Sequence, residues 1–197
     1  MSAPTTDIEI MSTAAVLLGK KAFTTIDDAD EFAVSMQKFF DLLVASELAK
    51  NVWQFARTFA QLSQVAAYDP DFAEYSTAYD LPADMLAVIR LYPNINYQIY
   101  GTRLLTASSG ELKMAYNYIV PVSKWSAPFK EYMVYSLASK MAMSVTENAN
   151  LIGMMKMERE SARAIAMYVD SQNSPNVPIQ SAPWIEVRTR GSTGGHW

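Results

Sequence analysis

Side chains that could carry out chemistry are few and scattered. The chain has no cysteine and a single histidine, His196, which follows two glycines. A Ser–His–Asp triad needs a rigidly held histidine, and a zinc site needs several His or Cys ligands. Neither GxGxxG nor GxxxxGK[ST], the phosphate-binding loops, occurs. We therefore expect no metal, no cofactor and no catalytic activity.

Two groups of charged residues remain. The stretch "IDDADE" supplies Asp27, Asp28, Asp30 and Glu31. These carboxylates could form a glycosidase acid pair or a magnesium site, but an acidic helix start, favoured by the helix dipole, is the preferred interpretation. The stretch "MERESAR" predicts a solvated helix face with charge pairs three and four residues apart. Its alternative is a charged subunit interface, with Glu158, Arg159 and Arg163 as candidates.

Composition limits the class of protein. The chain has 197 residues, half of them hydrophobic, and a net charge of −4. Such a length predicts one or at most two domains. The negative charge argues against a protein that binds nucleic acid by neutralising phosphates. No signal peptide pattern and no run of about 18 apolar residues is present, so we expect a soluble protein made in a cytoplasm.

The elements that would position these groups follow from periodicity. Caps and apolar stripes at helical spacing predict four helices, at 6–18, 26–46, 126–145 and 147–170. Residues 53–122 are rich in Tyr, Ile, Val and Thr and predict a β-rich insert. We predict an α+β fold: a mainly α-helical four-helix bundle with a small antiparallel β-sheet inserted between the helix pairs. Residues 1–170 would form one domain.

Within these helices, the capping pair Thr25 and Asp28 is expected to start the second helix, and Ser126 with Pro128 the third. The last two helices should form an antiparallel hairpin. The methionines of "KMAM" and "LIGMMKM" are expected in the core. The predicted core stripes are Phe32, Met36, Phe39 and Leu43; Phe129, Met133, Leu137, Met141 and Val145; and Leu151, Met155, Ala162, Ile165 and Val169.

Strands are expected in the insert where apolar and β-branched residues alternate between turn signals. Gly101 and the group ending at Gly110 should form turns between strands. The candidate strands are "WQFARTFAQL", "MLAVIRLY", "YQIY", "RLLTA" and "KMAYNYIV".

Residues 171–197 should form an extended C-terminal arm. Proline and glycine interrupt it, yet its end reads "PWIEVRTRGSTGGHW". Tryptophan and arginine dominate binding hot spots, and alternating apolar and polar residues suit strand addition to a partner's sheet. The alternative is that "PWIEVR" folds back on its own helices. The expected partner-binding residues are Trp184, Ile185, Val187, Arg188, Arg190 and Trp197.

The succession of segments carries a resemblance. "AVLLGKKAFTTIDDADEFAVSMQKFF" is followed by W-x-F-A at Trp53–Ala56, Y-x-L-P-x-D at Tyr79–Asp84, and "SAPFKEYMVYSLASKMAMSVTENANL". From about Ala14 to Asp170 this order resembles the tail tubular protein A family, the head-to-tail adaptors of short-tailed bacteriophages. The ending "RGSTGGHW" is not part of the family pattern.

The resemblance implies a non-enzymatic structural protein of the virion. Its subunits would form a dodecameric ring between the portal protein and the tail nozzle protein, around the channel through which DNA leaves without specific binding. A C-terminal segment would dock on the portal. Two other functions remain open: a small acidic hydrolase using carboxylates such as Asp28 and Asp84, and a cytoplasmic interaction module that binds another protein through its arm.

Overall fold

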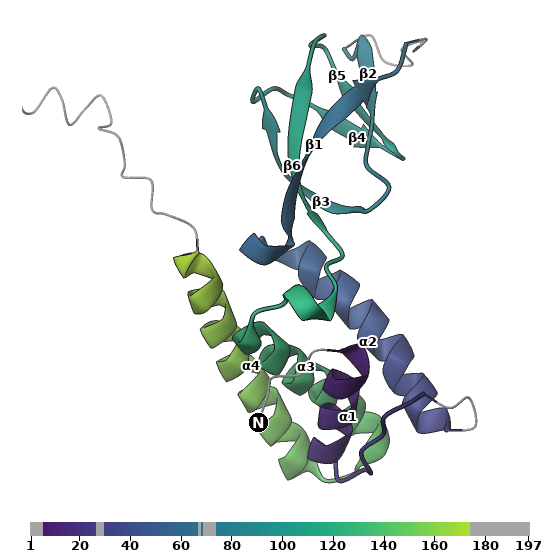
Figure 1. Ribbon diagram of the computed structural model, residues 1–197, viewed down its shortest axis with the longest axis vertical. Helices are drawn as coiled ribbons and strands as arrows, with labels where there is room; N and C mark the ends of the chain where they lie inside the picture. Colours follow the sequence, from purple (N-terminus) through teal and green to yellow (C-terminus); the bar gives the residue numbers. More distant parts are fainter. Residues whose placement is uncertain (1–5, 27–29, 67, 69–73, 174–197) are drawn as a thin grey trace, which may run out of the picture.

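Helices occupy one end of the molecule and a curled sheet the other (Figure 1). The computed structural model describes residues 6–26, 30–66, 68 and 74–173. Within them, the helices are α1 (Asp7–Leu17), α2 (Glu31–Lys50), α3 (Ala127–Val145) and α4 (Ala149–Gln172), with short 3-10 helices η1 (Gln54–Ala56) and η2 (Val122–Lys124). The strands are β1 (Arg57–Gln64), β2 (Thr77–Asp80), β3 (Met85–Tyr92), β4 (Gln98–Tyr100), β5 (Arg103–Thr106) and β6 (Leu112–Tyr118).

The expected mainly helical four-helix bundle with a small sheet is wrong. About 50% of the structure is helix and 21% strand, and the sheet is a six-stranded antiparallel half-barrel. It is therefore a second structural unit with a core of its own rather than a small insert. The sequence argument underestimated it because short strands give weak periodic signals.

Local capping sets where the helices begin. Thr6 and Glu9 form a capping box at α1. Helix α2 begins at Glu31 rather than at residue 26, because the Asp30 side chain accepts hydrogen bonds from the backbone N–H groups of Phe32 and Ala33. The Asn148 side chain caps α4 in the same way. Ser126 precedes α3 but makes no side-chain capping bond.

Helix α3 lies at the centre of the helical end. It packs against α1, α2 and α4 and is buried over most of its length. A turn at 146–148 joins it to α4, which runs back beside it as the expected hairpin (Figure 1). Helices α2 and α4 thus flank α3, and a cleft lies between the three.

Several side chains expected in the core are exposed. On α2 the buried phenylalanine is Phe40, while Phe39 is 43% exposed. On α4 the buried line runs through Met155, Ala162 and Ala166, which places Ile165 one residue, or about 100°, outside it. The methionines divide in the same way: Met141 and Met155 are buried, and Met143, Met154 and Met157 are exposed.

The strand order is β3-β6-β1-β2-β5-β4, with antiparallel pairing throughout. Strand β1 pairs with β6 through Arg57–Leu62 and then with β2 through its last two residues, so it belongs to both halves of the curled sheet. The expected turns are present, with Gly101 and Gly110 at positive φ. Strand β2 was not expected, and the start of "WQFARTFAQL" forms η1 instead of a strand.

An aromatic cluster joins the two ends of the molecule. The Phe129 ring of α3 lies 4.7 Å from the Trp53 ring, 4.9 Å from Trp125 and 4.8 Å from Phe55, measured between ring centroids. The Trp53 indole donates to the Glu47 carbonyl (3.1 Å), and the Trp125 indole to that of Val120 (2.8 Å). The indole N–H groups of both buried tryptophans therefore have a hydrogen-bond acceptor.

Asn117 connects the sheet to the C-terminal end of α2. This side chain on β6 is 1% exposed. Its Nδ2 donates to the carbonyl oxygens of Leu48 and Asn51, each at 2.8 Å. The last carbonyls of a helix have no partner within the helix. Asn117 therefore fixes the helix end and the sheet in one arrangement.

Replacing Asn117 with alanine should destabilise the protein by about 1–3 kcal/mol, because the buried carbonyls lose their donor. Urea unfolding followed by circular dichroism measures this change. Gln61→Ala, on the exposed face of neighbouring β1, is the matched control and should stay within about 0.5 kcal/mol of the parent. Equal effects of the two substitutions would contradict a special role for Asn117.

Candidate functional site

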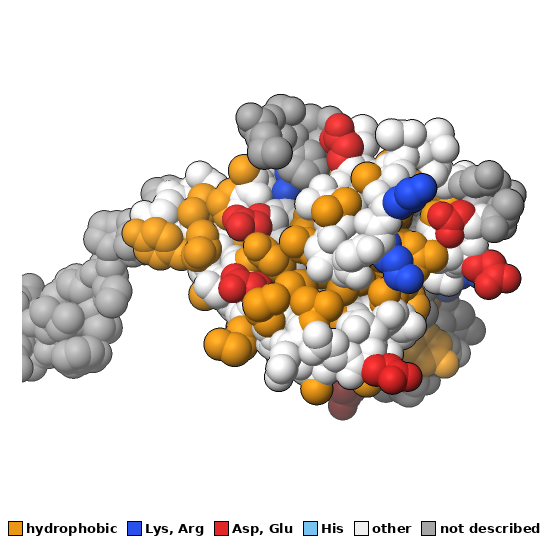
Figure 2. Space-filling view, turned by 90° about the horizontal axis from the view of Figure 1, so that it is seen from below, with side chains coloured by type: hydrophobic (Ala, Val, Ile, Leu, Met, Phe, Trp, Pro, Cys, Tyr) orange, Lys and Arg blue, Asp and Glu red, His pale blue; other side chains and the backbone are white. Residues whose placement is uncertain are grey.

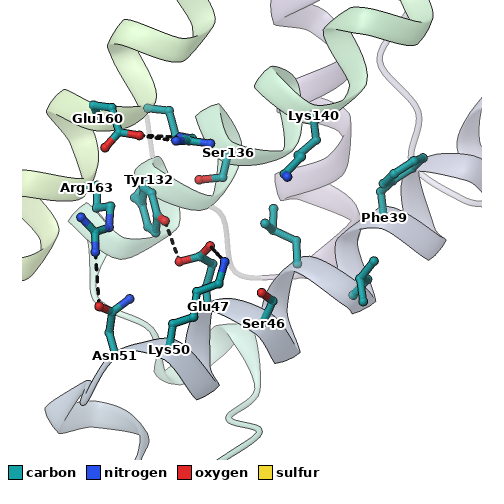
Figure 3. A pocket seen from close by; sticks show the side chains of 13 residues that line it. Phe39, Ser46, Glu47, Lys50, Asn51, Tyr132, Ser136, Lys140, Glu160 and Arg163 are labelled. Carbon is teal, nitrogen blue, oxygen red and sulfur yellow. Dashed lines mark hydrogen bonds and ion pairs between the residues drawn. The ribbon is translucent and has the colours of Figure 1, made fainter.

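A cleft lies between α2, α3 and α4. Its volume is about 700 Å³. Figure 3 shows charged side chains from all three helices converging on it. Its lining residues are Phe39, Leu42, Leu43, Ser46, Glu47, Lys50, Asn51, Tyr132, Ser136, Lys140, Arg159, Glu160 and Arg163.

Helix spacing brings these residues together. On α2 the lining residues recur every three or four positions from Phe39 to Lys50, so they share one face. Tyr132, Ser136 and Lys140 follow at four-residue spacing on α3, and Arg159 and Arg163 do so on α4. Three short stretches that are distant in the sequence therefore form one surface.

Both carboxylates in the cleft are paired. Glu47 accepts a hydrogen bond from the Tyr132 hydroxyl (2.8 Å) and forms an ion pair with Lys50 (3.3 Å). Glu160 pairs with the neighbouring Arg159. Arg163 donates to the Asn51 side-chain oxygen at 3.3 Å (Figure 3). Neither carboxylate is left free to act as a base or nucleophile in this arrangement.

Positive charge exceeds negative charge in the cleft. Lys50, Lys140, Arg159 and Arg163 stand against Glu47 and Glu160. Arg163 donates a hydrogen bond to the uncharged side chain of Asn51, and Lys140 forms no ion pair within the described residues. The cleft thus carries a surplus of two positive charges in a chain whose net charge is −4. It can attract an anionic group.

Burial changes the titration of Tyr132. Burial, and then its hydrogen bond to Glu47, raise the pKa of Tyr132 to about 12. At the far end of α4, burial raises the pKa of Asp170, whose carboxylate accepts a hydrogen bond from the Gln54 N–H at 2.7 Å. Asp170 thereby ties the end of α4 to η1.

The candidate residues singled out from the sequence do not form one site in the structure. Arg159 and Arg163 line the cleft, whereas Glu158 is exposed outside it. Asp84 accepts a hydrogen bond from Tyr116 (3.1 Å) in the sheet, and Asp30 caps α2. Glu31 is exposed in the first turn of α2. The other candidates lie outside the described residues: Asp27, Asp28, Trp184, Ile185, Val187, Arg188, Arg190, His196 and Trp197.

Sequence reasoning missed Glu47, Lys50, Tyr132 and Lys140. Their signal was weak, because nothing in the sequence shows that these side chains, from two separate helices, face the same cleft. Polar residues on the core side of an otherwise apolar helix, such as Glu47, are the feature that could have indicated a shared polar site.

A second surface lies on the outer side of α4. Met154, Met157, Ile165 and Tyr168 are all exposed, by 51%, 75%, 52% and 66%. Their spacing puts them, with Ser161, on one face of the helix, which we call the α4 stripe. Figure 2, seen from the helical end, shows hydrophobic side chains gathered on this end of the molecule, with acidic and basic side chains between them.

Comparisons with known proteins add no relative. No protein-family model matches the chain, and no curated protein matches it. Among the described residues, no group of three or more His, Cys, Asp or Glu side chains could hold a metal ion. None of the described helices combines the length and hydrophobicity that a bilayer-spanning helix requires.

The Tyr132–Glu47 hydrogen bond should affect how the free energy of unfolding depends on pH in the alkaline range. A folded pKa of about 12 against an unfolded value of 10.0 means that the folded state holds its proton more tightly. This stabilisation is complete below pH 10 and is lost as the pH rises to about 12. Tyr132→Phe should lower the free energy of unfolding by about 1.5–3 kcal/mol at pH 7.

The difference between the parent and Tyr132→Phe should shrink above pH 10, measured by urea unfolding at successive pH values. Tyr135→Phe, one turn on and only partly buried, is the control. A difference that stays constant from pH 8 to pH 12 would contradict this assignment.

Proposed function

We propose that this chain is a structural subunit of the head-to-tail adaptor ring of a short-tailed bacteriophage, placed between the portal and the tail nozzle. The observation that carries the proposal is the α4 stripe. Soluble monomers rarely expose large apolar patches, and four exposed apolar side chains, two on either side of Ser161, share one face of α4 from Met154 to Tyr168. A neighbouring subunit that covered it would remove this apolar surface from water.

The order of the sequence segments indicates which kind of assembly the chain would form. It resembles the tail tubular protein A family over most of the chain, and an adaptor of that family is a ring subunit. The negative net charge suits a ring around moving DNA, because an acidic wall repels phosphates.

The cleft gives less support to a hydrolase. An acid–base pair needs one carboxylate that is free and one whose pKa is raised. Glu47 and Glu160 are each engaged by a cation. An interaction module remains compatible with the α4 stripe, but the segment order favours the adaptor.

Polar substitutions in the α4 stripe test the proposal. Met157→Glu with Ile165→Glu should leave the unfolding free energy within about 0.5 kcal/mol of the parent, because both side chains are exposed. The same double variant should lose assembly with the portal ring, measured by mass photometry. Ile119→Glu, which replaces an exposed isoleucine outside α4, is the control. Normal assembly of the double variant would rule out the α4 stripe as a subunit contact.

Removal of the C-terminal arm is a separate test. A chain ending at Asn173 keeps all of α4, its C-cap and the bond between Asp170 and Gln54. We expect it to unfold at the same temperature as the full chain but to stay off the portal ring. The opposite outcome, equal binding by both chains in sedimentation, would exclude residues 174–197 as the docking segment.

A further inference from the structure

Three neighbouring strands, β1, β6 and β3, turn one face to the core of the sheet and the other to solvent. Successive side chains of a strand point to opposite faces, and Leu91 and Met114, which pair with each other, lie in the core. Their sequence neighbours Arg90, Tyr92 and Lys113 therefore point outward, and all three are exposed. This outer face of the sheet is separate from the cleft and from the α4 stripe.

A β-bulge in β3 adds a cation to the outer face. Val88 packs against the core of the sheet, and alternation alone would turn Arg90, two residues later, to the same side. The register of β3 shifts between these two residues, so that Arg90 pairs with Ala115 and points outward instead. Bulges commonly re-aim a side chain in this way. Arg90 is thereby placed on the same surface as Lys113.

Two exposed aromatic rings share this surface with the cations. Phe59 of β1 is 61% exposed and Tyr92 of β3 is 39% exposed. Their ring centroids lie 6.4 Å apart although β6 runs between the two strands. Beside Phe59, β6 carries Ala115, which is fully buried but belongs to neither hydrophobic core. The small side chain at this position lets the two rings approach each other above β6.

Arg57 connects the two rings. Its guanidinium carbon lies 5.1 Å from the centroid of the Phe59 ring, and its Nη2 donates to the Tyr92 hydroxyl at 3.5 Å. An arginine stacked on an aromatic ring keeps its other N–H groups for an anion. We call Arg57, Phe59, Arg90, Tyr92 and Lys113 the basic aromatic face.

The three cations of the basic aromatic face form no ion pair within the described residues. Glu111, two residues before Lys113, is exposed at the edge of the face and is not paired with it. Asp80 on neighbouring β2 pairs with Arg103 instead. Three cations against Glu111 leave a surplus of two positive charges on this surface, in a chain whose net charge is −4. The positive potential is therefore local.

We propose that the basic aromatic face binds single-stranded nucleic acid, with phosphates on the cations and bases stacked on the exposed rings. Sheets and small barrels that present aromatic rings beside basic side chains hold single strands in this way. An acidic protein segment is the competing partner, but lysine is depleted at the centre of protein contacts. The inference goes beyond the adaptor proposal and does not depend on it.

Binding of labelled oligothymidylate of about 12 nucleotides to the full-length chain, measured by fluorescence anisotropy at low salt, tests the face. Lys113→Ala should reduce the slope of log K against log[salt] by about 0.7, the contribution of one phosphate contact. Phe59→Ala should weaken binding about fivefold or more through lost stacking, with the slope unchanged. Both side chains are exposed, so both variants should fold, and a folding defect would not separate the two effects.

Matched controls lie on the helices. Lys140→Ala removes an exposed lysine of the cleft, and Tyr168→Ala removes an exposed tyrosine of the α4 stripe. Neither should change the affinity for the oligonucleotide or its salt dependence. Oligouridylate should bind as well, because phosphates and base rings are common to RNA and DNA.

Three results would overturn the proposal. The first is a parent chain that does not bind the oligonucleotide at low salt. The second is binding that falls with Lys140→Ala but not with Lys113→Ala, which would assign the anion to the cleft. The third is displacement by polyglutamate as effective as by unlabelled oligonucleotide, which would assign the face to an acidic protein segment. No portal ring enters these assays, so they leave the adaptor proposal to its own test.

Discussion

The junction around Phe129 is the constraint on which the rest of the structure depends. At this point the chain leaves the helices for the sheet and later returns. Strand β1 begins at Arg57, opposite Asn117 near the end of β6, so both connections lie side by side. Trp53 and Trp125, one on each connection, pack on Phe129. These contacts hold the two connections together. The six-stranded sheet can therefore be inserted in the sequence between α2 and α3 without moving the two helices apart.

Much of the helical end could be predicted from the sequence, because long amphipathic segments carry a strong periodic signal. The errors have local causes. Phe39 and Phe40 are adjacent, and only tertiary packing decides which one is buried. Ile165 differs by one position from the buried line of α4. Strand β2 has four residues and includes Ala78 and Asp80, both poor strand formers, so its neighbours rather than its own sequence specify it.

The candidate site was less predictable. Arg159 and Arg163 were singled out as contact residues and do line the cleft, but nothing in their own segment indicated Glu47, Tyr132 or Lys140 as neighbours. Packing of α2 and α4 on opposite flanks of α3 creates that neighbourhood. The same packing leaves the α4 stripe outside. A basic cleft and an apolar stripe on different sides of one helical unit together suit a chain that contacts more than one neighbour.

Electron microscopy of the full-length chain mixed with the portal ring of its phage tests the central claim most directly. The adaptor account predicts a closed ring of added density, coaxial with the portal and built from repeated copies of one subunit in which α4 contacts a neighbour. Portal rings without added density, beside a chain that remains monomeric, would contradict the account.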